Sequence, residues 1–217
     1  MFKHEEILVF DFETTGLSAT NDQILEIGAA KYKKVNGDFQ LVDELSLILN
    51  TDNPISEKIT EITGITPQMQ EKHGVSQNEG FNRLDSLINK DTLLIAYNIQ
   101  FDLGFLLNFY YNNYDKNFKL ENDILDIMAI YKDRHKFPHR LESGVSKYQI
   151  NFPNTHRALD DVKATYALLL AMKEEKNNIE KYVNVIGFNK KYGVSGPKLD
   201  KVRYVAQYGG FGEIDKL

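Results

Sequence analysis

Apolar stretches and short polar turns alternate over the first fifty residues. Residues 6–13, 24–33 and 40–49 are rich in aliphatic and aromatic side chains, and the turn-like sequences SATND and KVNGD separate them. Apolar stretches of this length, bounded by Gly, Asn and Asp, predict β-strands. Because the connections are short, we expect the three strands to pair antiparallel as a meander.

Beyond residue 50 the apolar positions take the spacing of helices, with one more strand. NPISEKITEITGIT predicts a short helix from about Pro54 to Gly64, and residues 77–89 predict a second one. TLLIAY, residues 92–97, is a continuous apolar run that predicts a buried strand. Further helices are predicted over residues 102–113, 123–135, 140–149 and 157–176. This order predicts an α/β fold with a mixed sheet, three antiparallel strands and then further parallel strands, flanked by helices.

The C-terminal part of the chain is more basic than the rest. The whole chain has a net charge of -5, but residues 181–217 carry seven Lys or Arg against three Asp or Glu. YVNVIGF and VRYVAQY flank KKYGVSGPK, which predicts a terminal hairpin or a clasp on the main domain. We therefore divide the chain into a main domain, residues 1–178, and a basic C-terminal extension, residues 179–217, which we expect to pack on that domain.

Composition narrows the class of protein. The 217 residues are 42% hydrophobic and include no cysteine, which excludes disulfides, thiolate metal sites and a cysteine nucleophile. No apolar run approaches the roughly 18 residues of a membrane span, and MFKHEE lacks the apolar region of a signal peptide. We expect a soluble, cytoplasmic protein with no membrane partner. Its acidic charge means that a bound polyanion would need metal ions or the basic tail.

Two carboxylates interrupt the first predicted strand, LVFDFETTGL at residues 8–17. Asp11 and Glu13 are two residues apart, so in a strand they share one face, roughly 6 to 7 Å apart. Two half-buried like charges are costly, and a divalent cation would remove that cost. The alternative is a pair of surface residues at a strand end. The small residues that follow allow Thr14, Thr15 and the neighbouring backbone to approach a sugar or phosphate.

A third acid follows the predicted strand at residues 92–97. In LIAYNIQFDLGFLL, Asp102 is expected to open a helix. It is therefore a candidate ligand at the end of that strand. The alternative is that Asp102 only caps the helix, and the two roles are compatible.

A histidine and a fourth acid stand near the start of the longest predicted helix, NTHRALDDVKATYALLL. Five helical steps rotate by about 140°, so His156 and Asp161 cannot share a face if both are helical. We expect the helix to begin after His156, leaving the imidazole on the entry loop. Asp161 shares the inward face with Ala158 and Thr165, which favours it over Asp160 as the buried acid. The alternative for His156 is a loop histidine without a catalytic task.

In their order and spacing, these segments resemble the DEDDh branch of the DEDD 3′→5′ exonucleases. FDFETTGL is similar to the first motif of that family, AYNIQFDLGFL to the second, and HRALDDVKAT to the third, with its His-x-x-x-x-Asp form. The resemblance covers about residues 6–172, also includes QILEIGAAKY and TGIT, and extends to the proofreading epsilon subunit of bacterial DNA polymerase III. It implies a ribonuclease-H-like fold and makes the main domain an exonuclease domain.

The resemblance also implies roles for the candidate residues. His156 would be the general base, and the four acids would hold two Mg²⁺ or Mn²⁺ ions per site through Asp11, Glu13, Asp102 and Asp161. Two such ions activate the attacking water and neutralise the leaving oxygen, and carboxylate oxygens are the ligands these hard cations prefer. A neutral imidazole near pH 7 can accept the proton of the water.

The chain departs from the family pattern at one position of the second motif. Tyr97 stands where many relatives have His before the Asn, and we expect this to alter packing or substrate contact rather than to abolish the chemistry. The sister branch uses Tyr-x-x-x-Asp in its third motif. Here that spacing occurs only at Tyr111 and Asp115, too soon after the second motif, so the histidine branch is preferred.

Substrate contacts are expected at the ends of the first two motifs, from Thr14, Thr15, Gly16, Leu17, Asn98 and Phe105. Leu17 or Phe105 would stack on bases without reading sequence; the alternative is that they pack in the core. Basic tail residues alternate with aromatic ones and are candidates to follow a phosphate backbone, namely Lys190, Lys191, Lys198, Lys201 and Arg203 beside Phe188, Tyr192 and Tyr204. The alternative is a solvated basic surface.

We therefore expect a metal-dependent 3′→5′ exonuclease that releases nucleoside monophosphates from single-stranded or frayed DNA ends, as in proofreading or repair. An enzyme that trims RNA or short oligonucleotides with the same site is the alternative. A non-catalytic nucleic-acid-binding module would be expected to lack at least one acid, and here all are present. Association with a DNA polymerase stays open, because neither end carries a convincing sliding-clamp peptide.

Overall fold

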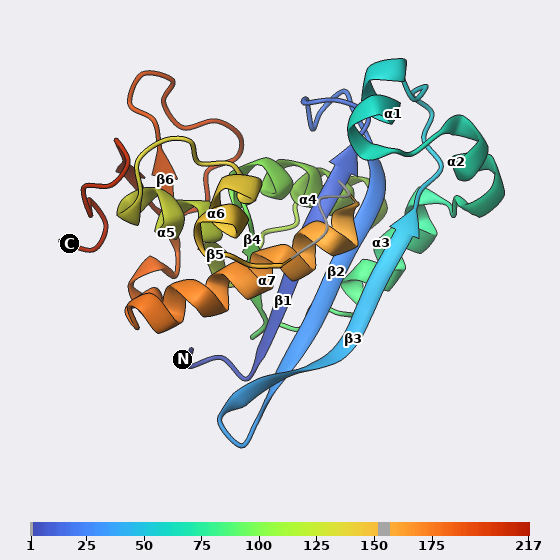
Figure 1. Ribbon diagram of the computed structural model, residues 1–217. Coiled ribbons are helices and arrows are strands. Elements are labelled where there is room, and N and C mark those ends of the chain that lie inside the picture. The colour runs from blue at the N-terminus through green and yellow to red at the C-terminus, as the bar shows by residue number, and fades with distance from the viewer. Residues whose placement is uncertain (1, 152–156) are drawn as a thin grey trace.

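The computed structural model describes residues 2–151 and 157–217 (Figure 1). A five-stranded mixed sheet forms its centre, with strand order β3-β2-β1-β4-β5. The strands are β1 (Glu6–Thr14), β2 (Ile24–Val35), β3 (Asp38–Ile48), β4 (Leu93–Ala96) and β5 (Ile124–Asp126). β1, β2 and β3 pair antiparallel, whereas β4 pairs parallel with β1 and with β5. The predicted α/β fold with a mixed sheet is confirmed.

β1 lies inside the sheet and is covered on both faces. Leu8 and Phe10 belong to one apolar cluster and Ile7 and Val9 to another, as the alternation of side chains along a strand requires. Asp11 and Glu13 continue the face of Val9. The alternation that places apolar side chains in two clusters therefore also places Asp11 and Glu13 at the end of the cluster that contains Val9.

Helices cover the two faces of the sheet (Figure 1). On the face of Val9 lie α5 (Ile127–Arg134) and α7 (Ala158–Glu175), with α6 (Leu141–Lys147) packed on α7. On the opposite face lie α3 (Gln77–Asp85) and α4 (Ile99–Asn113). No helix in the described ranges is long and apolar enough to cross a membrane.

The short helices after β3 differ in part from the prediction. α1 (Glu57–Thr63) begins after Ser56, whose side chain caps it, and ends at Gly64, which adopts the left-handed φ of 71°. α2 (Pro67–His73) was not predicted, although Thr66 caps it and Pro67 occupies its first position, a typical start signal. α3 ends at Asp85 instead of residue 89.

Two boundaries near the candidate site were predicted wrongly. α4 begins at Ile99, three residues before Asp102, because Asn98 takes a left-handed φ of 64° and turns the chain directly from β4 into the helix. The helix predicted over residues 123–135 is instead the short strand β5 followed by α5. Asp126 separates the two, since its side chain accepts a hydrogen bond from Met128 N and caps α5.

The C-terminal residues form a short 3-10 helix (Ile179–Tyr182) and the strands β6 (Val185–Phe188) and β7 (Arg203–Ala206). β6 and β7 pair parallel, so the predicted hairpin is wrong. Residues 189–202 are long enough to return the chain to the same end, which parallel pairing requires.

The buried carboxylate of Asp133 in α5 connects this segment to the rest of the structure. It accepts hydrogen bonds from Tyr182 Oη, Gln207 Nε2 and the backbone N of Ile214. The division of the chain at residue 178 stays a prediction.

Candidate active site

The start of α7 lies directly on β2. A Cβ atom built on Gly28 would come within 2.3 to 2.5 Å of the backbone of Ala158 and Leu159. Gly28 stands opposite Asp11 in the β1–β2 register. This close approach, which requires a residue without a side chain, brings the first turns of α7 to the acidic end of β1.

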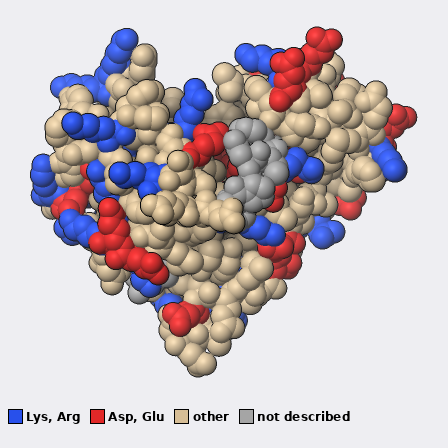
Figure 2. Space-filling view, in the orientation of Figure 1, with Lys and Arg blue, Asp and Glu red and all other residues tan. Residues whose placement is uncertain are grey.

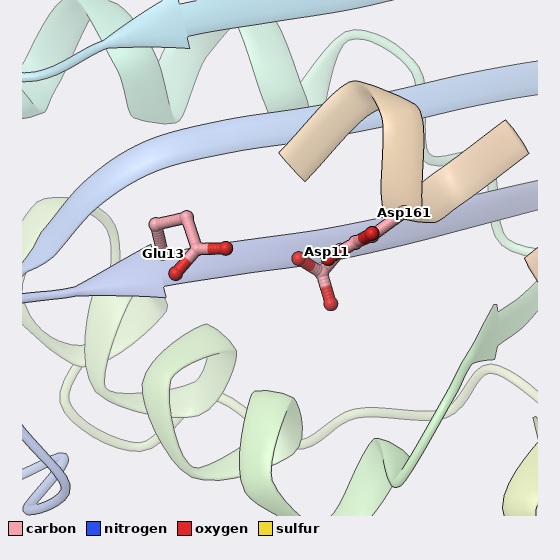
Figure 3. Close-up of side chains that lie close together, drawn as sticks. All are labelled: Asp11, Glu13 and Asp161. Atoms are coloured by element: carbon pink, nitrogen blue, oxygen red, sulfur yellow. The ribbon is translucent and has the colours of Figure 1, made fainter. Parts of the chain in front are cut away.

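Asp161 from α7 meets Asp11 and Glu13 from β1 at that point (Figure 3). Each of the three residues offers a carboxylate oxygen, and these oxygens lie within 4.8 Å of one another. All three residues are partly exposed. The structure thus brings together, from opposite parts of the sequence, three of the four acids predicted as metal ligands.

The surroundings of these carboxylates disfavour negative charge in the absence of a cation. Burial, followed by the charges of Asp161 and Glu26, raises the pKa of Asp11 to about 8. Burial and the charge of Asp11 raise the pKa of Glu13 to about 9, although Arg157 acts in the opposite direction. A group of carboxylates held this way accepts either protons or a cation.

Asp102 lies beside this group at the first turn of α4. It is only 2% exposed, and its Oδ1 accepts a hydrogen bond from the backbone N of Phe12 at 3.2 Å. Burial raises its pKa well above the ordinary value, and the nearby charge of Asp11 adds to that effect. Asn98 holds the N-cap position, so Asp102 is not the cap of this helix. Its carboxylate instead ties α4 to β1.

All four acids line one open pocket of about 520 Å³. Tyr97, His139 and Arg140 line it as well, although only Tyr97 drew attention in the sequence. The Tyr97 hydroxyl donates to the backbone oxygen of His139 at 2.9 Å, and burial raises its pKa, which keeps it a donor. Arg140 is exposed and stands at the N-cap of α6. His139 and Arg140 were not predicted from the sequence, although the basic stretch HKFPHR was an available signal.

Glu26 and Arg157 are two further residues near the site that were not predicted from the sequence. Glu26 is fully buried, faces Glu13 in the β1–β2 register and accepts hydrogen bonds from Arg157 Nε and Nη2 and from Ala158 N. The side chain of Arg157, the N-cap residue of α7, makes no capping hydrogen bond. The carboxylate of Glu26 on the neighbouring strand accepts the hydrogen bond from Ala158 N instead. A charged residue inside the apolar run ILEIGAA was the available signal.

Asp126 is a further buried acid at the end of β5. It is 1% exposed, and its Oδ1 accepts hydrogen bonds from the backbone N of Asn98 and of Met128, each at 3.0 Å. Burial raises its pKa to about 6. Asp126 therefore holds the left-handed turn between β4 and α4, and with it the start of the helix that carries Asp102.

The candidate substrate contacts differ in exposure. Thr14 Oγ1 donates to the backbone oxygen of Gly16 at 2.6 Å, and Thr15 Oγ1 accepts from Gln23 N at 3.0 Å, so both hydroxyls shape the loop after β1. Leu17 is 88% exposed, whereas Phe105 is 3% exposed and lies in the core. The core-packing alternative thus applies to Phe105 and not to Leu17.

Two other predictions concern His156 and the basic residues of the tail. His156 lies outside the described residues, immediately before Arg157 in the sequence. Of the tail cations, Lys201 contacts Asp123 at 3.0 Å through its Nζ. The Tyr204 hydroxyl accepts a hydrogen bond from Leu199 N. Lys201 therefore ties the tail to the main domain, whereas Tyr204 forms a bond within the tail.

The chain is similar to known proteins along most of its length. A family model described as an exonuclease matches residues 8–169. Two DNA polymerases III of PolC type are similar to the chain: the protein of Clostridium perfringens is 34% identical over 206 residues, which cover 86% of this chain and 13% of that protein. The protein of Bacillus subtilis is also 34% identical, over 181 residues that cover 81% of this chain and 12% of that protein. The chain thus spans a small part of these relatives.

Solved structures share the fold. E. coli exonuclease I in a zinc-bound complex with single-stranded DNA superimposes with a TM-score of 0.69 at 24% identity, covering 83% of this chain and 43% of that one. E. coli exonuclease I in complex with a dT13 oligonucleotide gives a TM-score of 0.69 at 25% identity, covering 82% and 43%.

Proposed function

This chain belongs to the exonuclease family, and we propose that it removes nucleoside monophosphates one at a time from the 3′ end of single-stranded or frayed DNA. The observation that carries the proposal is the convergence of Asp11, Glu13 and Asp161, whose carboxylate oxygens lie within 4.8 Å of one another. Asp102 lines the same pocket. A role in proofreading or repair, association with a DNA polymerase and a cytoplasmic location belong to the same proposal, supported by the PolC-type relatives.

The acidic group fits a divalent metal. Its members are partly buried like charges with raised pKa values, and their hard oxygen atoms suit Mg²⁺ or Mn²⁺. Asp11, Glu13 and Asp161, with Asp102 beside them, would hold the two ions that we propose. When bound, such ions lower the pKa of an attacking water and neutralise the charge of the leaving oxygen.

Three other residues have separate tasks in the proposed reaction. Arg140 presents an exposed cation to a phosphate in the pocket. Arg157, held by Glu26, lowers the pKa of Glu13 and so favours its charged form. We propose His156 as the group that accepts the proton of the attacking water. The support for His156 is its spacing to Asp161 in the third motif.

The proposal is tested by digesting 5′-labelled DNA and RNA oligonucleotides of equal sequence in Mg²⁺. The expected result is a ladder that shortens from the 3′ end of DNA, with Asp11→Ala inactive. Asp43→Ala is the matched control, because Asp43 is an exposed acid on β3, and it is expected to cut like the wild type. RNA cut more than about tenfold faster than DNA would favour the RNA-trimming enzyme. Binding without cleavage by the wild type would favour a binding module.

A further inference from the structure

We infer that residues 195–197 of the basic C-terminal segment form one wall of a groove that receives the unpaired nucleotides upstream of the 3′ end. The occupant is single-stranded DNA, so the inference rests on the proposed function and extends it to a segment of the chain beyond the acidic pocket. These residues lie outside the stretch that matches the exonuclease family, residues 8–169.

The groove has a floor and two walls. α4 supplies the floor, the loop from Leu17 to Thr20 supplies one wall, and Ser195, Gly196 and Pro197 supply the other. Its volume is about 540 Å³, within the usual range of ligand sites.

Each wall is fastened to the floor by a side-chain amide of α4. Gln100 Nε2 donates to the backbone oxygens of Ser195 at 2.5 Å and Pro197 at 2.6 Å. Asn108 Nδ2 donates to the backbone oxygen of Ala19 at 2.7 Å. One helix therefore sets the position of both walls, and the width of the groove between them.

Glycine is required at the point where the C-terminal wall meets the floor. Gly196 has a φ of +73°, and a Cβ atom on it would lie 3.0 Å from Gln100 Nε2. Both the left-handed backbone and the close contact disfavour any other residue. On the floor, a Cβ atom on Gly104 would lie 3.2 Å from Ala19 Cβ.

The C-terminal wall is also held from behind. Lys201 Nζ contacts Asp123 at 3.0 Å, and Leu199 N donates to Tyr204 Oη at 3.0 Å. Leu199 packs against the main core and Val202 is buried in it. The wall is thus a fixed part of the structure and can act as a binding surface.

The groove continues from the acidic pocket. Asn98 and Phe101 line both, so a strand whose 3′ end reaches the acids extends directly into the groove. Leu17, 88% exposed, and Tyr111, 37% exposed, also line the groove. Exposed apolar and aromatic surfaces stack on unpaired bases without reading their sequence.

Charge complements the phosphates of such a strand. Lys198 follows Pro197 directly and is exposed, as are Lys190 and Lys191 in the same loop. Figure 2 shows Lys and Arg side chains gathered on the lobe at the upper left, where Figure 1 places β6 and the C-terminal loops. The pocket itself is acidic, so this basic lobe supplies positive charge that attracts the strand.

Photo-crosslinking tests the inference. A ten-nucleotide oligo-dT carrying 4-thiothymidine at the fourth position from its 3′ end is bound to the full chain in Ca²⁺, irradiated, and mapped by mass spectrometry. We expect crosslinks in residues 189–203, with or without additional crosslinks at Leu17 and Tyr111. Crosslinks confined to residues before 180, or none at all, would overturn the inference.

Binding of dT10 and dT2, measured by fluorescence anisotropy in Ca²⁺, provides the second test. Gly196→Ala is expected to weaken dT10 about tenfold and dT2 less than twofold, because it displaces one wall. Lys198→Ala, a surface change, is expected to weaken the binding of dT10 about threefold. It should also reduce the slope of log affinity against log salt concentration by about one. Lys90→Ala is the matched control, an exposed lysine before β4, and is expected to change neither.

Equal loss for both lengths, or no loss for dT10, would contradict the groove. Neither measurement requires turnover, so a failure here is distinguishable from a failure of the cleavage experiment, which tests the proposed function.

Discussion

Glu26 on β2 and Arg157 at the start of α7 form a bidentate ion pair, in which Arg157 Nη2 lies 2.5 Å and Nε 3.0 Å from Glu26 Oε1. Glu26 also accepts the backbone N–H of Ala158 at 3.1 Å. These bonds fix the first turn of the helix that carries Asp161. The position of an acid in the site therefore depends on a carboxylate outside the group of three.

Glu26→Gln is expected to lower kcat by about tenfold or more, because a shift of the first turn of α7 misplaces Asp161. It should lower the free energy of unfolding by about 1–3 kcal/mol, since Arg157 loses a charged partner. Steady-state kinetics and urea unfolding measure the two effects.

The control is Glu44→Gln, which removes the exposed pair between Glu44 and Lys163 of the same helix. Such a pair contributes about 0–1 kcal/mol, and kcat should not change. A Glu26→Gln enzyme with the kcat of the wild type would show that this carboxylate has no positioning role.

Asp161→Asn is expected to reduce kcat by about a hundredfold or more and to weaken Mn²⁺ binding, because it removes one of three clustered carboxylates. Asp160→Asn is the matched control on the same turn, outside that group, and should retain activity within about threefold. Kinetics and Mn²⁺ titration check both variants. The assignment of Asp161 is wrong if Asp160→Asn is the inactive variant.

Metal affinity is expected to rise with pH. The pKa values of Asp11 and Glu13 are raised to about 8 and about 9 in the metal-free protein, so at pH 6 both carboxylates hold protons that a cation must displace. Below the pKa of a carboxylate, the apparent affinity for the metal rises by up to about tenfold per pH unit for each proton that the metal displaces. This rise ends above pH 9. Calorimetric titration with Mn²⁺ from pH 6 to 9 measures it. Affinity that is independent of pH would contradict these shifts.

Arg140→Ala is expected to raise KM for an oligonucleotide about three- to tenfold, with a smaller change in kcat, because it removes an exposed cation from the lining of the acidic pocket. Arg140→Lys should recover part of the loss. Arg83→Ala, an exposed arginine on α3, is the control. A change in kcat alone would argue that Arg140 does not bind the ground-state substrate.

Local patterns predicted the elements whose contacts are local. The three antiparallel strands and α7 followed from apolar spacing and turn residues, and the i, i+2 spacing placed Asp11 and Glu13 on one face. The strand β5 was not predicted because its three residues are all buried and show no alternation of apolar and polar positions. Its parallel neighbour, β4, lies about thirty residues away, so no short turn marks the pair.

The parts of the site that were missed depend on distant contacts. The bond from Phe12 N to Asp102 joins residues 90 apart, and the Glu26–Arg157 pair joins residues 131 apart. A single sequence marks each acid as unusual in an apolar run, but the partner is determined by the packing of α4 and α7 on the sheet.

The most direct test of the central claim is anomalous diffraction from a crystal soaked in Mn²⁺. We expect a peak coordinated by carboxylate oxygens of Asp11 and at least one of Glu13 and Asp161, with no such peak in Asp11→Asn. A crystal of the wild type that binds Mn²⁺ elsewhere, while these three carboxylates remain free of metal, would contradict it.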